Sequence, residues 1–273
     1  MAGTRAVLTT GANSGIGLAC VLELARRGHR SIGSVRSGAK AEVVAKAAAD
    51  AGVEVETVLL DVTDADACRD VMARFELYGL VNNAGYGLTG AIEDVPDDEA
   101  RALMETMVMA PMRLARLALP AMRAAREGRI VNVSSIMGVT TTPLTGWYQG
   151  AKHALEALSD ALRIEVAGAG VRVVLVEPGG FKTAIWEDLD EDVAHRAGSP
   201  FADAYRRSQI LMKLGEPVMG DPSRVARVIA RAMGARRPRP RYLVGPDAQM
   251  LAMVNRVTPT AVKDTVTRIA LGL

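Results

Sequence analysis

The sequence is poor in cysteine and nearly balanced in charge. Its 273 residues include two cysteines, Cys20 and Cys68, without a CxxC spacing. This pattern indicates neither a metal knuckle nor a disulfide framework, so we expect both to be small buried apolar residues. Lysine and arginine total 33 against 31 aspartate and glutamate, a formal net charge of +2. Without a strong charge of one sign, no nucleic-acid partner is expected, and function has to lie in local sites.

The sequence also lacks a long apolar run. No window reaches the about 18 to 20 uncharged apolar residues that span a bilayer. The N-terminus enters a strand-like run without the basic and apolar regions of a secretory signal, so we expect a cytoplasmic protein. Residues 250–273 alternate apolar residues with Arg256, Lys263 and Arg268. They are predicted to form an amphipathic helix pair on the body, a partner subunit or a membrane surface, and packing on the body is favoured.

Short β-branched runs alternate with longer helical stretches along the chain. This alternation predicts repeated β-α-β units, and the length permits one large domain. We therefore predict a single α/β Rossmann-type domain over residues 1–273, with a doubly wound parallel sheet of about seven strands and helices on both faces. Strands are expected at residues 6–10, 31–35, 54–60, 79–82, 128–134, 171–176 and 241–244, and helices at 16–27, 39–51, 64–75, 97–126 and 147–167.

Three segments are expected to depart from this regular pattern. The helix over 97–126 crosses Pro111 and Pro120, which predicts a bend or two consecutive segments. Residues 200–217 and the Arg/Pro-rich stretch 236–241 are predicted to be irregular. Within the single domain, residues 184–216 are expected to form a substrate-covering excursion and residues 246–273 a C-terminal helical tail.

A glycine-rich turn follows the first predicted strand. Residues 10–17 read TGANSGIG and lead into the first predicted helix. Glycines there let the backbone turn tightly and approach a pyrophosphate at the helix N-terminus. Such a turn alone is weak evidence, but its place between a strand and an amphipathic helix favours a dinucleotide site over an ordinary tight turn. The predicted cofactor contacts are Gly11, Asn13, Ser14, Gly15, Ile16 and Gly17.

The end of the second predicted strand bears on the choice of cofactor. An acidic residue there holds the ribose hydroxyls of NAD, whereas a basic one pairs with the 2′-phosphate of NADP. Residues 34–37 contain no acid, and Arg36 offers a planar fork to a phosphate, assisted by the hydroxyl of Ser37. We therefore favour NADP(H) over NAD(H). The alternative is that Arg36 is a solvated surface residue.

Tyr148 and Lys152 are four residues apart in a strongly helical segment, so they lie on one face, one turn apart. An ammonium and a cationic nicotinamide beside a phenol each favour the phenolate, so Lys152 and the bound cofactor are expected to lower the pKa of Tyr148, and Lys152 to hold the nicotinamide ribose. Ser135 follows the fifth predicted strand, where its hydroxyl can bond a substrate oxygen. The three residues predict acid/base catalysis at a carbonyl or alcohol.

Further short motifs follow in order: Asp61-Val62, NNAG at residues 82–85, and Pro178-Gly179 with Thr183 beyond it. With the glycine turn and the YxxxK pair, they resemble the short-chain dehydrogenase/reductase family over roughly residues 5–183. The overall pattern leans toward its hydroxysteroid and retinol dehydrogenase members. The resemblance implies a catalytic Ser135, Tyr148 and Lys152, a carbonyl/alcohol substrate and a homodimer or homotetramer. It also implies cofactor contacts at Asp61, Val62, Asn83, Ala84, Gly85, Tyr148, Lys152, Pro178, Gly179, Phe181 and Thr183.

One position departs from the family pattern. The family usually has an asparagine in the middle helix that holds a relay water, and Met107 stands in that place. A thioether is a feeble acceptor and cannot anchor water as an amide does. Either another group or solvent supplies the proton, or turnover is slow. An alternative to catalysis is therefore a non-catalytic NADP(H)-binding sensor or scaffold, whereas a sugar-nucleotide epimerase is disfavoured by the glycine spacing.

The substrate is indicated by composition alone. Apolar side chains follow the Pro178-Gly179 motif and suggest a lipophilic ketone or alcohol. The alternative, which we favour for most of them, is that they pack this excursion onto the core. They are Trp186, Leu189, Phe201, Tyr205, Ile210, Leu211 and Met212.

Overall fold

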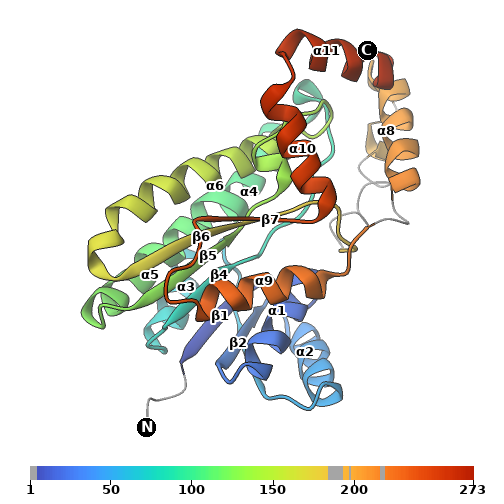
Figure 1. Cartoon of the computed structure of the whole chain (residues 1–273). Coiled ribbons are helices and arrows are strands. Elements are labelled where there is room, and N and C mark those ends of the chain that lie inside the picture. Colours follow the sequence, from blue (N-terminus) through green and yellow to red (C-terminus); the bar gives the residue numbers. More distant parts are fainter. Residues whose placement is uncertain (1–4, 184–192, 197, 216–218) are drawn as a thin grey trace.

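The computed structural model describes residues 5–183, 193–196, 198–215 and 219–273. It shows a seven-stranded sheet in the order β3-β2-β1-β4-β5-β6-β7, in which every pairing is parallel (Figure 1). The strand order reverses between β1 and β4, and ligands of open α/β sheets bind at such a switch point. The predicted doubly wound fold is confirmed. The strands are β1 (Ala6–Thr10), β2 (Arg30–Val35), β3 (Val55–Leu59), β4 (Gly79–Asn82), β5 (Gly128–Val133), β6 (Val171–Pro178) and β7 (Arg241–Val244).

Helices cover both faces of the sheet (Figure 1). Alternate residues of a strand point to opposite faces, so Leu8 of β1 packs in the core under α3 and α5, whereas Val7 packs in the core under α1 and α9. Asp64 caps α3 by accepting from two backbone N–H groups. Cys20 and Cys68 are fully buried, as predicted. These helices are α1 (Gly15–Arg26), α2 (Gly38–Asp50), α3 (Ala65–Ala73), α5 (Ala110–Ala124), α6 (Gly146–Glu165) and α9 (Pro222–Gly234).

The long middle helix is two segments, as predicted, but a π-helical turn separates them. α4 (Asp97–Met104) leads into the π turn Glu105–Met109, which continues as α5. Pro111 explains the position of this turn: a proline has no N–H to donate to the carbonyl of Met107, and its ring crowds that carbonyl, which favours a wider turn. Pro120 lies inside α5 without ending it. The π turn places Met107 and Thr106 beside the cavities described below.

The last part of the chain contains three helices at the carboxyl end of the sheet. They are α8 (Ala202–Gly215), α10 (Pro246–Val257) and α11 (Thr260–Leu271), with α11 lying between the other two (Figure 1). The prediction that residues 200–217 are irregular is wrong over α8, because Tyr205 anchors that helix in a buried cluster with Leu271. The structure shows the predicted C-terminal helix pair, but the favoured packing of its apolar residues on the body is wrong, because Met253, Val257, Val266 and Ile269 are exposed. In the part of the chain described above, no helix has the length and apolar character to cross a membrane.

Candidate active site

Two cavities of similar size meet at the carboxyl ends of the strands. The first, about 620 Å³, is lined by the glycine turn and the ends of β2, β3 and β4; we call it the glycine-turn cavity. The second, about 640 Å³, is lined by Ser135, Tyr148 and Lys152; we call it the Tyr148 cavity. The two cavities share the residues Ile16, Asn83, Gly85 and Thr183, so they form one continuous site.

The glycine turn has a backbone that other residues rarely adopt. Gly11 and Gly15 have φ angles of +67° and +51°, in the left-handed region. A side chain at Gly17 would place its Cβ 2.1 Å from the carbonyl oxygen of Gly11. The turn therefore needs glycine at all three positions, and it brings bare backbone to the wall of the cavity.

The N-terminus of α1 is arranged to receive an anion. Its N-cap residue, Ser14, makes no side-chain bond to the helix, and the first turn of α1 carries no acidic residue. The first N–H groups of a helix have no partner within it, and the helix dipole favours negative charge there. Because Gly15, Ile16 and Gly17 line the glycine-turn cavity at this end, the turn suits a pyrophosphate.

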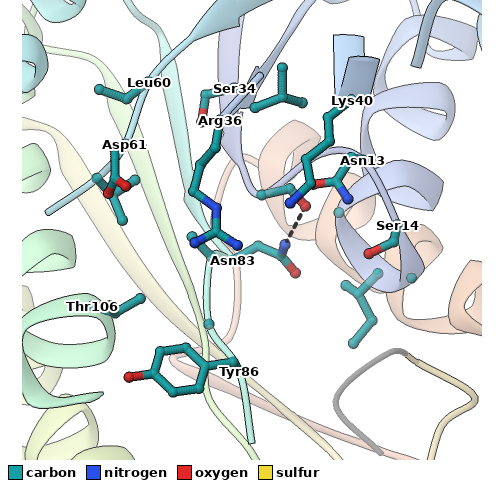
Figure 2. Close-up of a pocket in the computed structure, with 18 of the residues that line it drawn as sticks. Asn13, Ser14, Ser34, Arg36, Lys40, Leu60, Asp61, Asn83, Tyr86 and Thr106 are labelled. Carbon is teal, nitrogen blue, oxygen red and sulfur yellow. Dashed lines mark hydrogen bonds between the residues drawn. The ribbon is translucent and has the colours of Figure 1, made fainter. Parts of the chain in front are cut away.

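Two basic side chains reach into the same cavity. Figure 2 shows Arg36 and Lys40 extending into it, between Asp61 on one side and Asn13 and Ser14 on the other. Ser37 lies between them in sequence, but its hydroxyl caps α2 by accepting from the backbone N–H of Lys40. The expected help of this hydroxyl to Arg36 is thus replaced by Lys40. Sequence reasoning missed Lys40. Its position, one turn after Arg36 and at the capped N-terminus of a predicted helix, could have indicated it.

Asp61 and Asn83 are held by bonds that fix their directions. The Oδ1 atom of Asp61 accepts from the backbone N–H and the hydroxyl of Thr63, at 2.9 and 2.7 Å. These bonds lower the pKa of Asp61, so its carboxylate is ionised. Asn83 Nδ2 donates to the carbonyl oxygens of Thr10 and Gly11, at 2.9 and 3.2 Å, which ties β4 to the glycine turn. Of the predicted contacts, the structure places Gly11, Asn13, Ser14, Gly15, Ile16, Gly17, Arg36, Asp61, Val62, Asn83, Ala84, Gly85 and Thr183 around this cavity.

The structure also brings the predicted Ser135, Tyr148 and Lys152 together in one wall. All three line the Tyr148 cavity, with Pro178, Gly179, Phe181 and Thr183 also around it. Tyr148 and Ser135 are joined by a side-chain hydrogen bond. Lys152 Nζ donates to the carbonyl oxygen of Val133 at 2.9 Å and lies 5.7 Å from the centre of the Tyr148 ring. The phenol, hydroxyl and ammonium groups are therefore fixed around one point.

The pKa of Tyr148 differs from the expected direction. Burial raises the pKa of Tyr148 to about 12, and the bond with Ser135 acts in the opposite sense. Burial lowers the pKa of Lys152 to about 8, against the pull of the Glu156 carboxylate. The expected lowering of the pKa combined Lys152 with a cationic nicotinamide. In the protein alone the desolvation of the phenolate dominates and the Lys152 ammonium is bonded to Val133, so the pKa of Tyr148 is raised. Tyr148 is a neutral phenol here.

Met107 occupies the position where a relay asparagine was expected. It is buried, packs in one apolar cluster with Tyr148 and lines the Tyr148 cavity. A Cβ added to Gly85 would lie 3.2 Å from the Cε of Met107, so the thioether fills the space beside the NNAG motif. This wall of the cavity is apolar and offers no amide to bind water.

A buried carboxylate pair lies behind Lys152 and escaped the sequence reasoning. Glu156, one helical turn after Lys152, and Glu177 of β6 both bond to Arg241 of β7, at 3.2 and 3.1 Å. Arg241 also contacts Asp160, at 2.6 Å. The side chains of Glu156 and Glu177 are 7% and 3% exposed. Burial together with the charge of Glu156 raises the pKa of Glu177 to about 7. One arginine thus balances the charge of three carboxylates. This favours one proton remaining on the pair formed by Glu156 and Glu177.

This pair predicts a pH dependence of stability. The folded pKa of Glu177, about 7, exceeds its ordinary value of 4.5, so the folded state holds more protons than the unfolded state between these pH values. The free energy of unfolding should therefore fall as pH rises through this window. Glu177→Gln removes the titration and should stabilise the protein at alkaline pH by about 1 to 3 kcal/mol. Urea unfolding at acidic and alkaline pH measures this; Glu165→Gln, at an exposed site, is the control. An unchanged slope for Glu177→Gln would contradict the pair.

The apolar side chains that were expected to surround a substrate are mostly elsewhere. Met212 lines the Tyr148 cavity, but Tyr205 is buried in a separate cluster, against which Phe201 packs. Ile210 and Leu211 are exposed. Trp186 and Leu189 lie outside the described residues. The cavity wall is instead rich in methionine, with Met107, Met137, Met212, Met219 and Met250 around it.

The Pro178-Gly179 motif is fixed from α10. Asp247 accepts from the backbone N–H of Gly180 at 2.6 Å, and a Cβ at Gly179 would lie 2.0 Å from the same carboxylate. Gly179 is therefore required where α10 approaches the end of β6. This contact connects the C-terminal helices to the wall of the Tyr148 cavity.

Comparisons with known proteins agree with this geometry. The chain is 31% identical over 250 residues to 3-ketodihydrosphingosine reductase of Bacteroides thetaiotaomicron, covering 90% of this chain and 89% of the relative. It is 32% identical over 283 residues to human retinol dehydrogenase 5, covering 95% and 86%. A crystal structure of a metagenomic short-chain oxidoreductase in complex with NADP superposes with a TM-score of 0.70 at 27% identity, covering 88% and 96%. The short chain dehydrogenase family profile matches residues 5–194, and the chain belongs to this family of oxidoreductases.

Proposed function

We propose that the protein interconverts a carbonyl and a secondary alcohol with NADP(H), that its substrate is lipophilic, and that Tyr148 is the acid/base. The observation that carries the proposal is the single wall formed by Ser135, Tyr148 and Lys152 where the Tyr148 cavity joins the glycine-turn cavity. A dinucleotide laid across both cavities reaches this wall from the glycine turn. The Tyr148→Phe experiment in the Discussion tests it.

The residues around the glycine-turn cavity fit NADP(H). The N–H groups of Gly15 to Gly17 suit the pyrophosphate, Asp61 suits the adenine amine, and Arg36 with Lys40 suits a 2′-phosphate. Lys152 suits the nicotinamide ribose. When bound, NADP(H) supplies the hydride. The NADP complex of a similar structure supports the choice of cofactor class, and the two cations support NADP(H) over NAD(H).

For carbonyl reduction, the protein groups handle the proton. With NADPH bound to supply a hydride to the carbonyl carbon, the Tyr148 hydroxyl would donate its proton to the carbonyl oxygen, which gives the alcohol. Ser135 bonds the same oxygen as negative charge develops on it. Tyr148 is left as a phenolate, which the nearby ammonium of Lys152 stabilises and reprotonates. Alcohol oxidation runs these steps in reverse.

The Tyr148 cavity supports a lipophilic substrate. Its wall combines several flexible thioethers with the apolar side chains of Ile136, Phe181 and Leu251. Methionine adapts to irregular apolar shapes, which suits long or bulky hydrocarbon. The names of two relatives, a 3-ketodihydrosphingosine reductase and a retinol dehydrogenase, point to the same class. We also propose a cytoplasmic homodimer or homotetramer that pairs through the long helices α5 and α6.

Lys152 predicts a pH limit for reduction. Its pKa is lowered to about 8, so the ammonium is lost as pH rises above that value. The kcat/KM for ketone reduction should then fall about tenfold per pH unit above pH 8, because the phenolate loses its cation and its proton source. Lys152→Arg, which keeps its charge, should be slower but lack this decline. NADPH binding over the same range is the control, and a wild-type profile that stays flat well above pH 8 would contradict the assignment.

A non-catalytic NADP(H) sensor or scaffold is the second candidate, and Met107 is the observation that favours it. Without an amide beside Lys152, proton supply from solvent is restricted. This reading expects tight NADPH binding without turnover over a broad carbonyl panel. An increase in turnover for Met107→Asn would argue against it.

A further inference from the structure

Exposed apolar side chains concentrate at the C-terminal end of the described structure. Of the 18 large hydrophobic side chains that are exposed among the described residues, three are on α8, five on α10 and three on α11, and one more, Leu273, follows α11. These three helices stand together at the carboxyl end of the sheet (Figure 1). We call the exposed side chains of α8, α10 and α11 the C-terminal apolar surface. Single exposed apolar residues are ordinary, but a contiguous group marks an interaction site.

On α10 the exposed residues form one stripe. Met250, Met253, Val254 and Val257 follow the spacing i, i+3, i+4 and i+7, and they are 57%, 66%, 46% and 72% exposed. An amphipathic helix of a globular protein normally turns this stripe toward the core. Here the other side faces the body: Ala248 is buried, and Asn255 donates to the carbonyl oxygen of Val139 at 2.6 Å. The helix is therefore fixed with its apolar stripe outward.

α11 repeats this arrangement. Val262, Val266 and Ile269 follow the spacing i, i+4 and i+7 and are 49%, 62% and 73% exposed. Lys263 donates to Asn255 of α10 at 2.8 Å, and Leu271 is buried with Tyr205 of α8. These contacts hold α11 against α10 and α8 while its apolar stripe stays outward. The two stripes together form a larger exposed apolar group than the single exposed residues that are ordinary on a protein surface.

The C-terminal apolar surface is continuous with the Tyr148 cavity. Met250 and Leu251 are 57% and 42% exposed and also line that cavity, and Met212 of α8 lines it too. At these residues the apolar surface continues into the mouth of the cavity. A lipophilic molecule can therefore pass from the surface to the cavity there without crossing polar side chains. The surface therefore serves entry to the site.

The charge of the three helices indicates which partner covers them. They carry six basic residues, among them Arg256, Lys263 and Arg268, against three acidic ones. One of the acids, Asp247, is bonded to the backbone of Gly180. A two-fold dimer would bring this surface against itself, cation facing cation. Apolar stripes flanked by cations instead match an anionic lipid surface.

We propose that the C-terminal apolar surface docks on an anionic phospholipid bilayer, with the mouth of the Tyr148 cavity turned toward the lipid. Docking itself is independent of catalysis, whereas the entry of substrate from lipid rests on the proposed function. The apolar stripes enter the interface between headgroups and acyl chains, and the cations pair with lipid phosphates.

Cosedimentation of the full-length protein with vesicles tests the proposal. We expect binding to vesicles of phosphatidylglycerol and phosphatidylcholine in equal parts, at least about tenfold stronger than to phosphatidylcholine alone, and weakened by salt. Ile269→Glu should reduce binding about tenfold or more. Val43→Glu is the matched control, because Val43 is 48% exposed on α2, away from the surface and from the helices α5 and α6 that are proposed to pair subunits. Arg256→Gln should weaken binding to the anionic vesicles, and Arg69→Gln on α3 should not.

Thermal unfolding and NADPH binding establish that each variant is folded, and Val257→Gln, at a site 72% exposed, replaces Ile269→Glu if that variant fails to fold. Wild-type protein that stays in the supernatant with both vesicles overturns the proposal. So does equal loss of binding in Ile269→Glu and Val43→Glu. A dimer in light scattering that Ile269→Glu dissociates, without vesicle binding, would assign the surface to a second copy. Reduction of a water-soluble ketone by these variants reports separately on the proposed function.

Discussion

Tyr148→Phe should lower kcat for ketone reduction by about 10³-fold and leave the Kd of NADPH unchanged within about twofold. The substitution removes one oxygen atom, the one that bonds Ser135 and that we propose as the proton donor to the substrate oxygen. Positioned general acids contribute about 10² to 10⁴-fold to a rate. The ring remains, so its packing against Met107 and the 5.7 Å approach of Lys152 are kept. Steady-state NADPH oxidation measures kcat, and fluorescence titration measures the Kd of NADPH.

The matched control is Tyr86→Phe. Tyr86 lines the glycine-turn cavity and does not line the Tyr148 cavity. Its hydroxyl has no place in the proton transfer, so kcat should change less than about threefold. If Tyr148→Phe retains most of the wild-type kcat, the proton comes from another group, and the acid/base role of Tyr148 is wrong.

Arg36→Ala should raise the Kd of NADPH by about 10- to 100-fold and leave the Kd of NADH nearly unchanged. Charge-assisted hydrogen bonds are worth about 1.5 to 3 kcal/mol each, which corresponds to this range. NADH lacks the 2′-phosphate, so it gains nothing from the guanidinium. Calorimetric titration of both cofactors measures the two changes in one protein.

Lys40→Ala is the graded comparison for Arg36→Ala. Lys40 reaches the same cavity but offers a point charge rather than a planar fork, so its loss should cost less, about 3- to 10-fold for NADPH. Arg69→Ala, on the exposed side of α3, should change neither Kd. Equal losses for NADPH and NADH in Arg36→Ala would show that the guanidinium contacts something common to both, and the preference for NADP(H) would be wrong.

The sheet was predictable because each strand is a short apolar run ended by a turn. β1, β4 and β7 begin and end at the predicted residues, and the other strands differ by one or two residues at an end. The Ser135, Tyr148 and Lys152 wall followed from two local facts: one helical turn between Tyr148 and Lys152, and a strand that ends just before Ser135. Local spacing fixes both without knowledge of the rest of the chain.

Features that depend on distant contacts escaped prediction. α8 was predicted to be irregular, yet Tyr205 fixes it by bonding Asp94, 111 residues earlier, at 2.7 Å. The pair Glu156 and Glu177 needed the pairing of β6 with β7 to bring Arg241 beside both. The direction in which the pKa of Tyr148 shifts depends on the burial of its side chain, which local sequence does not reveal. α9 was overlooked, although its apolar spacing at Val225, Ile229 and Met233 was visible in the sequence.

Transfer of deuterium from NADPH labelled at the nicotinamide C4 is the most direct measurement of hydride transfer at the Tyr148 wall. With a lipophilic ketone and wild-type protein, we predict that the product alcohol carries deuterium on its carbinol carbon, transferred from one face of the nicotinamide. In Tyr148→Phe this transfer should be far slower. Mass spectrometry of the product detects it. NADPH that binds tightly but never passes deuterium to any ketone of a broad panel would contradict the catalytic assignment and leave a cofactor-binding protein.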